Sequence, residues 1–197
     1  MSSTTANPPQ ATAPKKRSVF KTFLKFAGLA VVLFVGVVLA VASTKPAIFR
    51  VERSIHVNAP ADKIAPHIND LKKWGSWSPW EKVDPDMKRE YSGAETGVGA
   101  KYAWDGDSNI GAGKIEVTES TPEKIAFNLD FLRPMEAHNV AEFLMTPDGE
   151  GTKLTWAMQG DNTFMGKVIQ VFLSMDDMVG KPFDEGLNSL KNLAEGK

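Results

Sequence analysis

The chain has 197 residues, of which 42% are apolar and 24% are charged, and it contains no cysteine. This composition is that of an ordinary folded protein, and the lack of cysteine excludes disulfide scaffolds, cysteine-ligated metal sites and thiol nucleophiles. The net charge of −1 hides two unequal parts: residues 1–45 carry six basic residues and no acidic one, whereas residues 46–197 hold 17 basic and 24 acidic residues. Affinity for nucleic acid comes mostly from Lys and Arg that neutralise phosphates, so the acidic body argues against nucleic acid as a partner.

Residues 1–25 are predicted to form a disordered tail with a basic end. Residues 2–14 contain three prolines and no large apolar side chain, so they cannot bury enough surface to offset the entropy lost on ordering. Five basic residues follow between Lys15 and Lys25.

Residues 26–44 predict a transmembrane helix. The seventeen residues from Phe26 to Ala42 are uncharged and would form a helix of about 26 Å, close to the roughly 30 Å of a bilayer core. The alternative is a secretory signal, because Ala40-Val41-Ala42 has the pattern that signal peptidase cuts. Under either reading, the basic residues before the run predict a cytoplasmic N-terminus and a periplasmic C-terminal domain, anchored or secreted after cleavage.

Residues 46–197 have the length of one domain. Alternating apolar and polar residues predict a first strand over 49–57, and a short helix is predicted over 60–71. Six further strand signals, separated by turns rich in Gly, Asp and Pro, cover 87–91, 100–104, 113–119, 124–131, 136–145 and 152–159. A long amphipathic helix is predicted from Phe164 to Leu193, with a kink or split at Gly180 and Pro182.

Short connections favour antiparallel pairing of these strands. An antiparallel sheet with helices on one face is an α+β architecture. We therefore expect a curved antiparallel sheet of about seven strands around a long C-terminal helix, with a cavity between the two and one transmembrane helix in front.

The body resembles the START-like helix-grip superfamily, and within it the SRPBCC or polyketide cyclase/dehydrase-like proteins of bacteria that carry an N-terminal anchor. The resemblance covers residues 47–195 and rests on short motifs: Phe49–Ile55 with Ala59-Pro60, Ile68-Asn69-Asp70 ahead of Trp74, Trp77 and Ser78-Pro79-Trp80, Ser92-Gly93 with Gly97-Val98-Gly99, Thr155-Trp156, and Met178–Lys181. It implies a helix-grip fold with a ligand cavity. It does not establish cyclase chemistry, because one fold hosts many functions.

Aromatic residues are the candidates for the wall of this cavity. An apolar wall with few polar groups suits a lipid or a flat hydrophobic ligand, and packing within the core is the alternative role for the same rings. The predicted cavity residues are Trp77, Trp80, Trp104, Phe127, Phe131, Trp156, Phe172 and Met175.

Three polar residues are the candidates for catalysis. Arg53 is in phase with the apolar residues of its strand, so it forms an ion pair, for which Glu119 is the candidate partner, reaches solvent at the end of the strand, or binds a carboxylate or phosphate head group in the cavity. His138 stands among carboxylates on one strand face, where it would act as a general base or simply face solvent. Catalysis predicts that at least two of Arg53, Glu119 and His138 converge in one pocket.

We expect no metal and no cofactor. Asp105, Asp107, Asn109 and Glu116 match positions of a calcium loop, but Ile110 stands where that loop requires glycine. A β-hairpin turn explains the same residues.

The leading prediction is a membrane-tethered START-like domain that binds a lipid or other hydrophobic small molecule in its cavity. The first alternative is a polyketide cyclase/dehydratase-like enzyme that acts in the same cavity. The second alternative is a domain that interacts with another protein of the bacterial envelope.

Overall fold

The computed structural model describes residues 16–197. Its helices are α1 (Lys16–Ser43), α2 (Ala61–Asn69), α3 (Phe164–Ile169) and α4 (Met175–Ala194), with two 3-10 helices, η1 (Leu71–Ser76) and η2 (Pro79–Lys82). Its strands are β1 (Ile48–Val57), β2 (Lys88–Gly93), β3 (Ala100–Asp105), β4 (Ala112–Ser120), β5 (Lys124–Arg133), β6 (Ala137–Asp148) and β7 (Gly151–Asp161). All seven predicted strands are present.

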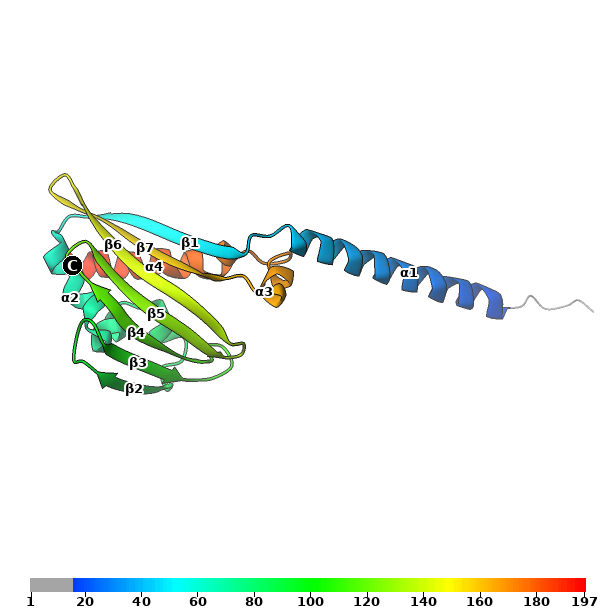
Figure 1. The fold of residues 1–197 in the computed structure, drawn as a ribbon, viewed down its shortest axis with the longest axis horizontal. Helices are drawn as coiled ribbons and strands as arrows, with labels where there is room; N and C mark the ends of the chain where they lie inside the picture. Colours follow the sequence, from blue (N-terminus) through cyan, green and yellow to red (C-terminus); the bar gives the residue numbers. More distant parts are fainter. Residues whose placement is uncertain (1–15) are drawn as a thin grey trace, which may run out of the picture.

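The seven strands form one antiparallel sheet in the order β1-β7-β6-β5-β4-β3-β2. The first strand therefore lies beside the last, with Ile48 opposite Asp161 and Val57 opposite Thr152. Figure 1 shows α2 and α4 on one face of the curved sheet. This is the α+β helix-grip architecture that the sequence predicted.

The C-terminal helical segment differs from the prediction. It is divided at residues 170–174, whereas α4 continues through Gly180 and Pro182. Thr163 caps α3, because its Oγ1 accepts a hydrogen bond from the Gly166 N–H at 3.1 Å. The side chains of Asn162, just before α3, and Gln170, just after it, bond to each other at 2.8 Å and 3.3 Å. These side-chain bonds favour a short closed turn over a continuous helix.

The N-terminal helix is longer than predicted, because α1 begins at Lys16 and includes four of the five basic residues placed in the tail. The rest of that predicted tail, residues 1–15, lies outside the described part of the chain. From Phe20 to Ser43 the helix is long and apolar enough to cross a membrane, a test that a signal sequence also passes. Figure 1 shows α1 pointing away from the sheet.

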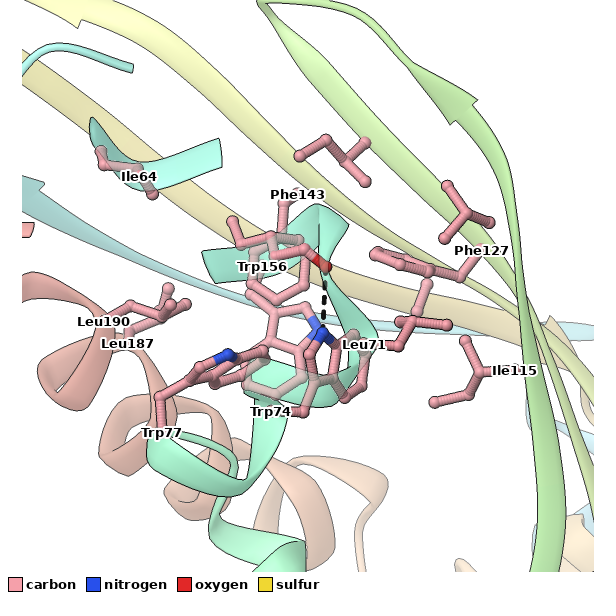
Figure 2. Close-up of a cluster of buried hydrophobic side chains, with 14 of the residues drawn as sticks. Ile64, Leu71, Trp74, Trp77, Ile115, Phe127, Phe143, Trp156, Leu187 and Leu190 are labelled. Atoms are coloured by element: carbon pink, nitrogen blue, oxygen red, sulfur yellow. Dashed lines mark hydrogen bonds between the residues drawn. The ribbon is translucent and has the colours of Figure 1, made fainter. Parts of the chain in front are cut away.

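The hydrophobic core lies between the sheet, α2, η1 and α4. Two tryptophans attach η1 to α2: Trp74 Nε1 donates to the Ile68 carbonyl at 3.0 Å, and Trp77 Nε1 donates to the His67 carbonyl at 2.9 Å. Both rings are thus buried with their polar atoms satisfied. Figure 2 shows them beside Trp156, with Leu187 and Leu190 of α4 on one side and Phe127 and Ile115 of the sheet on the other.

Candidate ligand-binding cavity

A cavity of about 120 Å³ lies between the inner face of the sheet, η1, η2 and α4. Most of the residues that line it are apolar or aromatic. The lining consists of Trp74, Ser78, Trp80, Glu81, Met87, Tyr102, Trp104, Ile110, Ile115, Phe127, Leu129, Phe131, Ala141, Trp156, Met158, Val179 and Phe183.

The alternation of side chains along each strand builds this wall. Residues two apart point to the same face, so Tyr102 and Trp104 of β3 both face the cavity, as do Trp156 and Met158 of β7. Gly113 on the neighbouring β4 makes room for one of these rings. A Cβ at Gly113 would lie 2.4 Å from the Trp104 ring, so any larger residue there would displace the ring.

Trp156 connects the sheet to the helices that close the cavity. Its ring stacks on Phe183 of α4, with centroids 4.2 Å apart and planes 5° from parallel. On the sheet it stacks on Phe143 at 4.7 Å. Trp80 of η2 meets it edge to face at 5.4 Å. One side chain of β7 therefore positions both α4 and η2 against the sheet.

A buried carboxylate and a phenol form the polar part of the wall. The Tyr102 hydroxyl donates a hydrogen bond to Glu81 Oε1 at 2.6 Å, and Arg89 Nε donates one to Glu81 Oε2 at 2.8 Å. The side chain of Glu81 is only 7% exposed. Burial, followed by the hydrogen bond to Glu81, raises the pKa of Tyr102 well above its ordinary value, so the phenol stays protonated and acts as a hydrogen-bond donor.

Ser78 is the second polar feature of the wall, and the sequence analysis missed it. The residue is 2% exposed, and its backbone N–H donates to the Trp74 carbonyl at 2.8 Å. It lines the cavity. The pattern Ser78-Pro79-Trp80 supported the resemblance, but nothing in it indicated that Ser78 would line the cavity.

Five of the eight predicted cavity residues line the cavity: Trp80, Trp104, Phe127, Phe131 and Trp156. The other three lie elsewhere. Trp77 is fully buried in the core outside the lining, Phe172 is 62% exposed, and Met175 packs on the core outside the lining. That any of these residues contacts a ligand stays a prediction.

Arg53 does not face the cavity and does not pair with Glu119. Its guanidinium donates to both oxygens of Asp176 at 2.7 Å and 2.8 Å, and to Asp184 at 3.3 Å. It lies against Gly180, where a Cβ would come within 2.2 Å of Arg53 Nη2. The prediction of a pair with Glu119 is therefore wrong, because two carboxylates of α4 are nearer.

The other two candidates for catalysis form ion pairs outside the cavity. Glu119 Oε2 is 2.9 Å from Lys124 Nζ, and its side chain is 43% exposed. His138 Nδ1 is 2.7 Å from Asp130 Oδ1, and its ring is 82% exposed. Neither lines the cavity, so the convergence that catalysis by these three residues requires is not present.

The calcium-like sequence forms a hairpin turn. Asp107 Oδ1 accepts hydrogen bonds from the backbone N–H groups of Asn109 and Ile110. Asp105 forms an ion pair with Arg133, and Glu116 Oε2 lies 3.4 Å from Lys101 Nζ. In the part of the chain that the structure describes, no group of three His, Asp or Glu side chains could hold a metal ion.

The family model described as "polyketide cyclase / dehydrase and lipid transport" matches residues 49–195, which is every strand and helix of the domain that forms the cavity. The chain belongs to this family. The match confirms the resemblance drawn from the motifs. No curated protein matches this member of the polyketide cyclase / dehydrase and lipid transport family.

Solved structures share the fold of this family member. The Zhui aromatase/cyclase from Streptomyces sp. R1128 is 18% identical with a TM-score of 0.55, over 75% of this chain and 94% of that chain. The di-domain ARO/CYC StfQ of the steffimycin biosynthetic pathway is 13% identical with a TM-score of 0.56, over 76% and 51%. Protein MLL2253 from Mesorhizobium loti is 17% identical with a TM-score of 0.53, over 76% and 98%. At these identities the likeness shows the fold alone.

Proposed function

We propose that this protein is a membrane-tethered domain that binds an apolar small molecule, or part of a lipid, in the cavity between the sheet and α4. The observation that carries the proposal is a cavity whose wall is mostly apolar and aromatic, with Ser78, Glu81 and Tyr102 among its few polar residues. Such a wall suits a ligand that is mostly apolar and places a polar atom beside one of these residues.

The size of the cavity limits what it holds. Pockets for drug-sized ligands measure about 300–1,000 Å³, whereas an engineered cavity of about 150 Å³ admits benzene. The volume of about 120 Å³ therefore accommodates one ring or a short piece of alkyl chain. A larger ligand requires α4 to move away from the sheet, where Phe183 and Val179 form the wall.

Two observations support tethering. The helix α1 is long and apolar enough to cross a membrane, and the basic residues at its beginning favour a cytoplasmic N-terminus. A membrane is also the reservoir of apolar molecules, so a tether keeps the cavity near its ligand. The description of the family includes lipid transport, which agrees with this role.

Native mass spectrometry of the full-length protein, extracted gently from its own membrane, tests the proposal. We expect a stoichiometric adduct that is lost on denaturation and whose mass identifies the ligand. Ala141→Leu should reduce the adduct, because Ala141 lines the cavity and the added atoms occupy it. Val140→Leu is the matched control, since Val140 is the neighbouring residue of β6, is 39% exposed and points to the other face.

Ser78→Ala is a second variant that leaves the volume of the cavity almost unchanged. It should lower adduct occupancy while the melting temperature stays near that of the unmodified protein. Absence of an adduct from the unmodified protein, or equal occupancy in Ala141→Leu and Val140→Leu, would overturn the proposal.

A cyclase- or dehydratase-like reaction is the second candidate function. It is favoured by one observation, the Glu81 carboxylate and Tyr102 phenol in the cavity wall, because proton transfer needs such groups within hydrogen-bond reach of the ligand. The same extraction distinguishes the two functions. A ligand recovered unchanged after incubation with the protein supports binding alone, and recovery of a cyclised or dehydrated product supports the enzyme.

A further inference from the structure

The segment of residues 164–174, which comprises α3 and the turn after it, exposes apolar side chains where a soluble surface would be polar. We call it the α3 segment. Four of its side chains are large, apolar and more than half exposed: Phe164 64%, Met165 54%, Phe172 62% and Leu173 55%. Its eleven residues include one charge, Lys167. Grouped apolar side chains of this kind mark a binding surface.

The α3 segment lies beside the second half of α1. The ring centroids of Phe172 and Phe34 are 6.5 Å apart, and α1 contacts α3. On α1, Val38 is half-buried and Ala42 is buried, whereas their neighbours are exposed. Phe34, Val38 and Ala42 follow one another at steps of four, so they share one face of the helix. Figure 1 shows α3 next to the end of α1.

This contact reaches into the proposed membrane span. Phe34 lies nine residues before Ser43, the last residue of α1. At about 1.5 Å per residue this is about 13 Å along the helix, a large part of one leaflet of a bilayer core about 30 Å thick. If α1 spans the bilayer, Phe172 cannot remain in water beside Phe34.

We propose that the α3 segment is a second membrane contact, whose four exposed apolar side chains lie in the hydrocarbon of the leaflet next to the domain. The inference rests on the membrane tether of the proposed function and extends it. The occupant is lipid, because the exposed apolar surface of the α3 segment continues into that of α1, where Val35, Val37 and Leu39 are 46%, 61% and 43% exposed.

The ends of the α3 segment suit this placement. Asp161 precedes it and Asp176 follows it, so carboxylates stand on both sides of an almost uncharged stretch and stay on the water side of the interface. Within the segment Lys167 is half-buried, and a lysine of this kind extends its ammonium group to the head groups.

The beginning of the α3 segment is also held near the end of α1. The side-chain amide of Asn162, two residues before the segment, donates at 3.1 Å to the carbonyl of Pro46, three residues after α1 ends. The helical bonds of α3, with the Thr163 cap, satisfy backbone groups internally, as hydrocarbon requires. The segment leads directly into α4, so the membrane contact adjoins the helix that closes the cavity.

The absence of native cysteine permits single-cysteine labelling of the full-length protein in vesicles of phosphatidylethanolamine and phosphatidylglycerol. Phe172→Cys and Leu173→Cys would each carry a fluorescent label that responds to its environment. Val98→Cys is the matched control, because Val98 is 58% exposed and lies on the loop between β2 and β3. We expect lipid-attached nitroxide to quench the labels at 172 and 173, and iodide in the water to quench the label at 98.

A fourth variant, Phe34→Cys, separates the inference from the tether. If the label at 34 is quenched by iodide, the tether of the proposed function is absent. If the label at 34 is in lipid but the label at 172 is in water, the tether stands and the second contact is wrong. A label at 172 that neither quencher reaches would show that a second copy or another protein covers the α3 segment, and that outcome also overturns the inference.

Discussion

Trp156 is the residue on which the packing of α4 against the sheet depends most. It is 4% exposed and lies between Phe143 of the sheet and Phe183 of α4. The sequence predicted Trp156 as a cavity residue on a strand over 152–159. Its position at the centre of the aromatic cluster depends on rings from η2, β6 and α4, which no local pattern contains.

Trp156→Ala is expected to destabilise the protein by about 3–5 kcal/mol, because it leaves a large cavity between the sheet and α4. Chemical denaturation in detergent, followed by the near-ultraviolet circular dichroism of the remaining tryptophans, measures the change. Val98→Ala is the control and should shift stability by no more than about 0.5 kcal/mol, since Val98 is exposed. A loss below about 1 kcal/mol for Trp156→Ala would contradict a structural role for the stack.

At the scale of elements, α4 is attached to the sheet at its beginning, middle and end. Asp176 near its beginning pairs with Arg53 of β1, and Phe183 stacks on Trp156 in the middle. At the end, Glu195 Oε1 accepts the Asn58 backbone N–H at 2.8 Å. The amphipathic spacing predicted the inner face of α4, but the sequence analysis placed its break at Gly180 and Pro182. Gly180 instead accommodates the Arg53 guanidinium.

The attachment at Glu195 predicts a dependence of stability on pH. Its hydrogen bond with Lys197, and then that with the Asn58 N–H, lower the pKa of Glu195 to about 2 from its ordinary value of 4.5. A carboxyl whose pKa is lower in the folded state stabilises the protein above its unfolded pKa, and this contribution is lost as the pH falls towards its folded pKa.

We therefore expect Glu195→Gln to remove part of the decrease in melting temperature between about pH 5 and pH 2. Glu185→Gln is the matched control on the same helix, because Glu185 is exposed and its only described ion pair, with Lys181, is 3.9 Å long. An equal decrease in melting temperature in both variants would show that Glu195 contributes no more than Glu185 to the pH dependence of stability.

At the scale of the whole molecule, the sheet and the hydrophobic core are complete without α1. The first strand pairs with the last, and among the described residues none before Phe49 belongs to the hydrophobic core cluster. The helix α1 meets the domain beside the α3 segment.

A chain that begins at Pro46 is therefore expected to fold as the full-length protein does. In the same detergent, its melting temperature should equal that of the full-length protein within a few degrees. The near-ultraviolet circular dichroism of its tryptophans should also match, because all five tryptophans lie after Pro46. A chain that begins at Pro46 and lacks this signal would show that α1 contributes to the core.

The sequence by itself determined the elements and their faces. Alternation of apolar and polar residues depends only on neighbouring positions, so seven strands, the inner faces of β3, β5 and β7, and the apolar helix could all be predicted. Four of the eight predicted cavity residues, Trp104, Phe127, Phe131 and Trp156, lie on those faces and line the cavity. The motifs also predicted the family.

Only the tertiary structure decided which residues meet. Arg53 pairs with Asp176, 123 positions along the chain, and Tyr102 bonds to Glu81 across 21 positions. Phe172 has the spacing of a core residue, yet the break before α4 turns it towards α1. Periodicity states which face of an element is apolar, but the partner of that face depends on how distant elements pack, and this packing also placed Ser78 in the wall of the cavity.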